Sequence, residues 1–170
     1  MIKKLTILLF MSLLTVTAGA QMKFGYLSYQ EAIQSMPDYA IAQRNMEKLR
    51  EQYANETKRA EDEFNRKYEA FLEGQKDFDK PILRKRQAEL QELLYKNIDF
   101  NKESERLLLQ AEKDMYRPLH DKLNNVLRYI GETRGYAFIV NTDNNSLPFV
   151  NSAYGENITT IVIDTLNNIK

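Results

Sequence analysis

The sequence predicts an α+β protein in which a small β-containing body carries a long antiparallel helical hairpin. The central two-thirds of the chain is rich in Glu, Lys, Arg, Gln and Leu, which are strong helix formers. Apolar residues in that part recur at helical spacing and form only a narrow stripe. Most glycines and β-branched residues lie near the two ends, where they favour short strands and turns.

Residues 1–20 have the pattern of a cleavable signal peptide. Two lysines precede an apolar run over residues 5–16, and Ala18-Gly19-Ala20 supplies small residues for cleavage. The run is shorter than the roughly 20 apolar residues of a transmembrane helix. An uncleaved anchoring helix is the alternative and fits this length less well. We therefore expect export, and we base the fold on the residues that follow.

Composition limits the remaining chain. It has no Cys, which excludes disulfides, thiolate metal sites and an acylated lipoprotein cysteine. The formal net charge is zero, and loss of residues 1–20 leaves a small acidic excess, so no attraction to nucleic acid is expected. The remaining length suffices for one domain with its own core.

The first elements follow from local pattern. Residues 23–28 are aromatic and aliphatic and predict a short strand, and a brief helix is expected over 29–35. Pro37 interrupts it. Asp38 is placed to cap a new helix, which then meets no helix breaker as far as about Glu73.

Apolar side chains of this first long helix fall on one stripe, whose members are Met46, Leu49, Tyr53, Ala60, Phe64, Tyr68 and Phe71. Nearly all intervening positions are charged or carry amides. Such a stripe can seal the seam between two helices but cannot form the core of a globular bundle. The segment is therefore interpreted as one half of an arm.

The chain is expected to reverse over residues 74–79, because Gly74 can end one helix and Asp79 can cap the next. Pro81 then lies in a first helical turn, where its missing N–H is tolerated. The second helix is predicted over 80–133, with a kink or local break at Pro118. Its apolar face comprises Leu83, Leu90, Leu94, Ile98, Leu108, Ala111, Met115, Leu119, Val126 and Ile130, and is interrupted by Asn101 and Glu105.

The C-terminal part returns to short elements. Glycines end the helix, and residues 136–140 and 147–150 predict two strands, the second confined to an edge by its proline. Residues 158–169 contain Thr and Ile that would suit a strand, but their apolar spacing favours a helix capped near Asn157.

These elements define the expected domain organisation. Residues 21–38 and 134–170 form the body, and residues 39–133 form the arm, with its tip near 74–79. The predicted body core comprises Phe24, Tyr26, Leu27, Phe138, Ile139, Val140, Val150, Ile158, Val162 and Leu166. A sheet this small is marginal alone, so self-association is expected.

No residue pattern supports catalysis. His120 is the only imidazole, beside Asp121, and has neither a Cys nor a second His to form a nucleophilic or metal site. Phosphate-binding and hydrolase motifs are absent from the sequence. We therefore predict a non-enzymatic protein without catalytic, metal-binding or cofactor-binding residues.

Three segments of this chain resemble the periplasmic chaperones called Skp or OmpH-like. They are residues 23–33 (KFGYLSYQEAI), residues 135–140 (GYAFIV) and residues 156–167 (ENITTIVIDTLN). Asn157 stands where the family often has Asp, and both residues can cap a helix. The match extends over essentially the whole chain after the signal peptide, although the central helices match only in length, charge density and spacing.

The resemblance implies a homotrimer whose β segments assemble one body, with three arms around a cavity that holds unfolded outer-membrane proteins in the periplasm without ATP. The best-known members are strongly basic, whereas residues 37–135 carry as many acidic as basic residues. This departure puts electrostatic capture of acidic or lipopolysaccharide surfaces in doubt, so the sequence supports contact with a membrane surface only weakly. Arg84-Lys85-Arg86 is interpreted as a solvated tip.

On this hypothesis the candidates for client contact are Phe64, Tyr68, Phe71, Tyr95, Ile98 and Phe100. The alternative is that these side chains only seal the arm. Gly74 and Pro118 are the hinge candidates, and Asn97, Asn101 and Glu105 are expected to weaken the seam. The alternative functions are a trimeric coiled-coil adaptor of the cell envelope and an accessory subunit of an enzyme.

Overall fold

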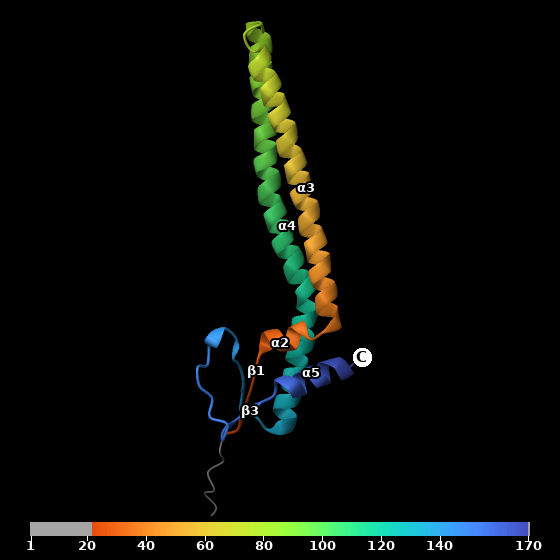
Figure 1. Cartoon of the computed structure of the whole chain (residues 1–170), viewed down its shortest axis with the longest axis vertical. Helices are drawn as coiled ribbons and strands as arrows, with labels where there is room; N and C mark the ends of the chain where they lie inside the picture. Colours follow the sequence, from red (N-terminus) through yellow and green to blue (C-terminus); the bar gives the residue numbers. More distant parts are fainter. Residues whose placement is uncertain (1–21, 170) are drawn as a thin grey trace, which may run out of the picture. The chain divides into compact units, whose positions relative to one another are not determined.

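The computed structural model describes residues 22–169, and within them the chain is mostly helical with three short strands (Figure 1). The signal peptide prediction lies outside the described residues. The chain forms two compact units. We call residues 22–35 with 122–169 the body unit, and residues 36–121 the arm unit. Helix α4 (Lys80–Arg134) contributes residues to both.

The body unit contains a three-stranded parallel sheet. Strand β1 (Phe24–Leu27) lies at its centre, between β2 (Ile139–Asn141) and β3 (Gly155–Asn157). Gly25 is in register with Ile139 on one side and with Glu156 on the other. The N-terminal strand therefore pairs with two strands that follow the long helices in sequence.

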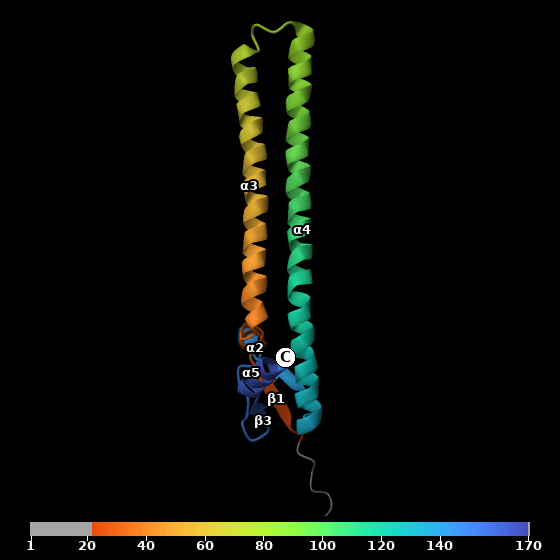
Figure 2. The same ribbon diagram turned by 90° about the vertical axis from the view of Figure 1, so that its right-hand side faces the viewer.

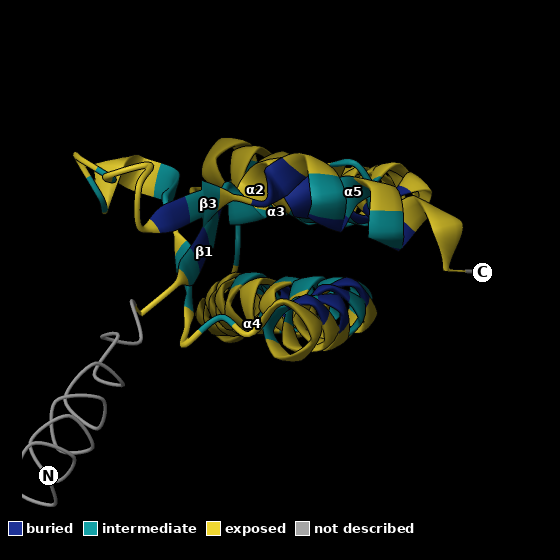
Figure 3. Ribbon diagram, turned by 90° about the horizontal axis from the view of Figure 1, so that it is seen from below, coloured by how far each residue is buried: buried dark blue, intermediate teal, exposed yellow. Residues whose placement is uncertain are grey.

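Two short helices and the end of α4 supply most of the body core. Helix α2 (Tyr29–Gln34) begins where the Ser28 hydroxyl accepts a hydrogen bond from the Glu31 backbone N–H, and it contacts α5 (Thr159–Asn168). Figure 3 shows the buried part of α5 in dark blue. The buried apolar side chains of this unit are Leu27, Ala32, Ile33, Leu123, Val126, Ile130, Ile158, Val162 and Leu166.

The arm unit consists of α3 (Pro37–Gly74) and the first part of α4, which run side by side in opposite directions (Figures 1 and 2). Its buried apolar residues are Met36, Ala42, Met46 and Leu119, all near one end. Over residues 47–118, all of which the structure describes, the only buried side chain is that of Ser104. The predicted thin seam is therefore confirmed.

The two long helices each differ from the prediction at one point. Helix α3 begins at Pro37, with Met36 as its N-cap and without a side-chain cap. Asp38 therefore lies inside the first turn, where its negative charge interacts favourably with the helix dipole. Helix α4 continues through Pro118 without the predicted break. A proline removes one backbone hydrogen bond, and the burial of Leu119 beside it favours continuation of the helix.

The end of α4 shortens the strand that was predicted over 136–140. Gly135 adopts a left-handed conformation (φ 67°), and the N–H of Tyr136 donates to the carbonyl of Gly131 at 3.0 Å. This closes the helix in a Schellman motif. The residues after Tyr136 lead the chain away from the helix, so β2 begins only at Ile139.

The strand predicted over 147–150 does not form. Asn144 and Asn145 both have φ of 57°, which turns the chain out of the sheet, and Pro148 has no N–H to donate. The third strand is β3 instead. The predicted terminal helix is confirmed as α5, and the Asn157 side chain accepts a hydrogen bond from the Thr159 N–H at 3.0 Å.

Candidate functional site

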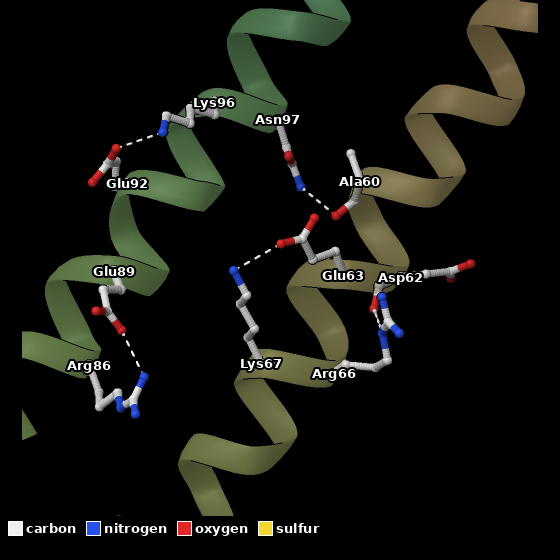
Figure 4. A network of polar contacts seen from close by, with 10 residues as sticks. All are labelled: Ala60, Asp62, Glu63, Arg66, Lys67, Arg86, Glu89, Glu92, Lys96 and Asn97. Atoms are coloured by element: carbon white, nitrogen blue, oxygen red, sulfur yellow. Dashed lines mark hydrogen bonds and ion pairs between the residues drawn. The ribbon is translucent and has the colours of Figure 1, made fainter.

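Two asparagines of α4 join the helices of the arm. The Asn97 side chain donates to the backbone carbonyl of Ala60 at 3.0 Å (Figure 4). The Thr57 hydroxyl donates to the Asn101 side chain at the same distance. We call these four half-buried residues the polar layer. The sequence pattern predicted that Asn97 and Asn101 weaken the seam, whereas both bridge it.

The seam between the polar layer and the turn is built from larger apolar groups. Helix α3 contributes Phe64 and Phe71, and α4 contributes Leu90 and Leu93, all half-buried. Phe78, in the turn, lies with its ring centroid 6.4 Å from that of Phe71. This centroid distance lies within the usual range for a contact between two aromatic rings.

Gly74 allows Phe78 to take this position. A Cβ atom at residue 74 would lie 2.6 Å from Cζ of the Phe78 ring, which is too close for any contact. Gly74, one of the two hinge candidates, therefore makes room for an aromatic side chain at the end of α3.

A groove of about 580 Å³ lies in this distal part of the arm. Its apolar lining is Ala70, Phe71, Phe78, Leu90 and Leu93, and its polar lining is Lys67, Arg86, Glu89, Glu92 and Lys96. We call it the distal groove. Both helices and the turn contribute to it, so it exists only when the hairpin is folded.

The charged rim of the distal groove is neutralised by ion pairs (Figure 4). Lys67 pairs with Glu63 at 2.8 Å, and Lys96 pairs with Glu92 at 2.7 Å. The hydrogen bond from each lysine lowers the pKa of its glutamate, so both carboxylates remain ionised. Arg86 pairs with Glu89 at 3.1 Å. These pairs are exposed and contribute little to stability.

Large exposed apolar side chains are concentrated in the distal half of the arm. They are Tyr68, Leu72, Ile82, Leu94, Tyr95 and Ile98, with only Ile41 and Leu109 in the rest of the arm unit. Of the candidates for client contact, Tyr68, Tyr95 and Ile98 are exposed, whereas Phe64, Phe71 and Phe100 are half-buried. Tyr95 leaves 56 % of its surface exposed.

The exposure of Leu94 and Ile98 corrects the predicted face of α4. Leu93 and Asn97 are half-buried in their place. A seam between two helices repeats on average every 3.5 residues, so successive steps of four residues drift off it. The apolar stripe therefore leaves the seam in the distal arm.

A polar cluster in the body unit joins β3 to the end of α4 and to the residue that precedes β1. Glu156 of β3 accepts from Lys23 at 2.8 Å, from Arg134 at 2.8 Å and from the Tyr136 hydroxyl at 2.6 Å. The hydrogen bonds from Lys23 and then Tyr136 lower the pKa of Glu156. Burial and the bond to Glu156 raise the pKa of Tyr136. The cluster therefore links the N-terminal segment of the body unit to its C-terminal segment.

The predicted body residues divide by burial. Leu27, Ile158, Val162 and Leu166 are buried, Phe24, Tyr26, Ile139, Val140 and Val150 are half-buried, and Phe138 is exposed. A second depression, of about 490 Å³, is lined in part by Leu27, Leu127 and Phe138. Phe138 stacks on Phe24 with ring centroids 5.2 Å apart.

Two further features bear on the class of protein. No helix within residues 22–169 is long and apolar enough to cross a membrane. Over the same residues, no group of three His, Asp or Glu side chains is arranged to hold a metal ion.

The model of the family described as "Outer membrane protein (OmpH-like)" matches residues 23–166. The chain belongs to this OmpH-like family. Its fold also resembles the crystal structure of a protein from Caulobacter crescentus CB15 that is described as a "putative outer membrane chaperone (OmpH-like)". The TM-score is 0.70 at 13 % sequence identity, and the match covers 88 % of this chain and 86 % of the other. No curated protein matches the sequence.

The sequence pattern of this OmpH-like protein does not predict every residue of the distal groove. Phe78 lies in the predicted turn and Leu93 lies one residue before the predicted stripe, so neither entered the apolar pattern. A heptad spacing counted back from Phe100 would have identified Leu93. The contact between Phe78 and Phe71 has no comparable signal in the sequence, because it depends on how the turn folds.

Proposed function

We propose that this protein is an ATP-independent holdase of the periplasm that binds unfolded outer-membrane β-barrel proteins between its arms. The observation that carries the proposal is the exposed apolar surface of the distal arm, on a hairpin whose seam buries almost no apolar side chain completely. Membership of the OmpH-like family supports the same function.

The physical requirements of a holdase agree with this surface. An unfolded client has to be held by many weak, non-directional contacts, because tight packing would select one conformation and slow release. Tyr68, Tyr95 and Ile98 offer separate apolar contacts on two helices, surrounded by charged residues that keep the arm soluble. Release then follows from the greater stability of the folded client.

We further propose that three chains associate through their body units, so that the arms enclose a cavity. The sheet has only three strands, and β2 and β3 are both edge strands. Phe138 leaves 48 % of its surface exposed beside the depression of the body unit. A small sheet with open edges and exposed aromatic residues gains stability when another chain covers it.

Gly74 and Pro118 are proposed as the positions at which an arm adapts to clients of different size. Gly74 lies at the turn, and Pro118 removes a backbone hydrogen bond from α4. Hydrogen exchange of the free protein tests this: faster exchange of the amides near these residues than along the middle of either helix supports the proposal. Uniform protection would contradict it.

The decisive experiment dilutes a urea-denatured porin into buffer with the chain that starts at Gln21, and follows aggregation by light scattering. A holdase keeps the porin soluble at stoichiometric concentration without ATP. A coiled-coil adaptor does not, and an enzyme accessory subunit instead copurifies with a permanent partner in fixed ratio.

A pair of double variants locates the binding surface. Tyr95→Ser with Ile98→Ser removes two exposed apolar groups of the distal arm, and a several-fold higher concentration is then needed to keep the porin soluble. Ile41→Ser with Leu109→Ser removes two exposed apolar groups elsewhere in the arm unit and is the matched control. Equal loss in both double variants contradicts a distal binding surface.

A further inference from the structure

We propose that the distal groove is a binding site for a single aromatic side chain of an extended, unfolded β-strand segment. The inference rests on the proposed function, because it names the feature of the client that the arm recognises. It differs from the general apolar contacts of the arm in that the groove is a defined cavity between two helices and a turn.

The groove is large enough to admit a side chain from another molecule. Its volume of about 580 Å³ lies within the range of about 300–1,000 Å³ that is usual for small-molecule sites. Leu90 and Leu93 form apolar walls on α4, and Phe71 and Phe78 supply two rings inclined at 44° to each other. A third ring can meet such a pair edge to face, which is a preferred arrangement of aromatic groups.

The charges at the rim favour an uncharged apolar group over an anion. Lys67, Arg86 and Lys96 each pair with a glutamate of their own helix. A lipid phosphate or a fatty-acid carboxylate would have to compete with these glutamates. An aromatic side chain enters the groove without breaking any of the three pairs.

The mixed signs of the rim also suit an extended strand. Transmembrane β-strands alternate apolar side chains with polar ones, and aromatic residues are frequent near the membrane interfaces. When one aromatic side chain enters the groove, its polar neighbours on the strand point away from the arm into solvent. The unpaired backbone N–H and C=O groups of the segment then meet a rim that offers both carboxylates and cations.

The experiment uses a ten-residue peptide of alternating polar and apolar residues with one central Trp. The protein contains no Trp, so all tryptophan fluorescence comes from the peptide. The chain that starts at Gln21 should shift this fluorescence to shorter wavelength. The same peptide with Leu in place of Trp, used as a competitor, should bind at least several-fold more weakly.

The groove is filled by Ala70→Phe, which adds a ring at a lining position and removes no existing contact of the seam. Ala88→Phe is the matched control, because Ala88 is also exposed on the distal arm but does not line the groove. We expect about tenfold weaker peptide binding by Ala70→Phe, equivalent to about 1.4 kcal/mol. The Ala88→Phe variant should bind as the wild type does.

Four outcomes overturn the proposal. The first is equal peptide affinity of the Ala70→Phe and Ala88→Phe variants, and the second is equal affinity of the wild type for the Trp and Leu peptides. The third is displacement of the peptide by dodecanoate that binds as tightly as the peptide does. The fourth is a change of molar mass in Ala70→Phe, which would indicate that copies of the chain contact one another in the groove. If the wild type nevertheless keeps denatured porin soluble, only the groove assignment fails. If it does not keep porin soluble, the proposed function itself fails.

Discussion

The body unit and the distal arm use apolar residues in opposite ways. In the body unit, nine apolar side chains are buried around one small sheet. In the arm, residues 47–118 bury none completely, and six large apolar side chains between Tyr68 and Ile98 are exposed. The same chain therefore contains a region stabilised by a closed core and a region stabilised by a partly wet seam.

The contrast indicates how one sequence combines stability with adaptable binding. A closed core loses stability sharply when a side chain is shortened, because a cavity remains. A half-buried seam lets solvent or neighbouring side chains fill the gap and therefore tolerates change. The proposed client surface lies in the tolerant region, and the proposed association surface lies in the region with the core.

The largest difference is expected from leucine truncation. Leu123→Ala in the body unit should lower the free energy of unfolding by about 2–5 kcal/mol, because this side chain has no exposed surface. Leu90→Ala in the half-buried seam should cost about 1–2 kcal/mol. Urea unfolding followed by circular dichroism at one fixed protein concentration measures both. Equal losses would show that the arm has a closed core after all.

A backbone change at the end of α4 ranks second. Gly135→Ala places a Cβ on a residue with φ of 67° and should destabilise the body unit by about 1–2 kcal/mol. Gly131→Ala, inside the helix, is the control, because a Cβ there lies 3.5 Å from Ile139 in ordinary contact. Thermal unfolding separates the two variants, and an equal effect would contradict a requirement for the left-handed conformation.

A smaller change tests the polar layer of the arm. Asn97→Ala removes the hydrogen bond to Ala60 and should destabilise the arm by about 0.5–1.5 kcal/mol. Hydrogen exchange should accelerate in the distal arm and stay unchanged in the body unit. Asn65→Ala, at an exposed position of α3, is the matched control. Faster exchange throughout the protein would indicate that the two units unfold together.

The smallest effect is expected from pH. Because the pKa of Glu156 lies below its ordinary value of 4.5 in the folded protein, its ion pairs contribute stability above that pH. This contribution is lost as the pH falls through the lowered pKa. Unfolding curves between pH 6 and 3 should therefore show a steeper loss for the wild type than for Glu156→Gln. Parallel curves would mean that the cluster adds nothing to the body unit.

Sequence patterns identified the elements whose physics is local. The long helices follow from residue type and spacing, and α5 follows from the helical period of Ile158, Val162 and Leu166. The strand expected over 147–150 does not form, because the two asparagines before it adopt a left-handed backbone conformation that turns the chain out of the sheet. Strand β3 was missed because Gly-Glu-Asn carries no strand pattern and pairs only because β1 offers it an edge.

The client-contact candidates show the same limit. Their residue types and helical spacing marked them as apolar positions of the arm, but the sequence alone left open whether each one seals the seam or faces solvent. Tyr95 and Ile98 turned out to be exposed because the seam of α4 follows a repeat of 3.5 residues through Leu93, Asn97 and Phe100.

The sequence by itself determined that this protein is a long helical hairpin joined to a small α+β body, because helix propensity, turn chemistry and a narrow apolar stripe act over a few residues. Only the tertiary structure decided which strands pair, that Asn97 and Asn101 bridge the arm, and that Phe78 folds over Gly74 to complete a groove. These features depend on contacts between residues distant in sequence or on the folded shape of a turn, and no local pattern encodes either.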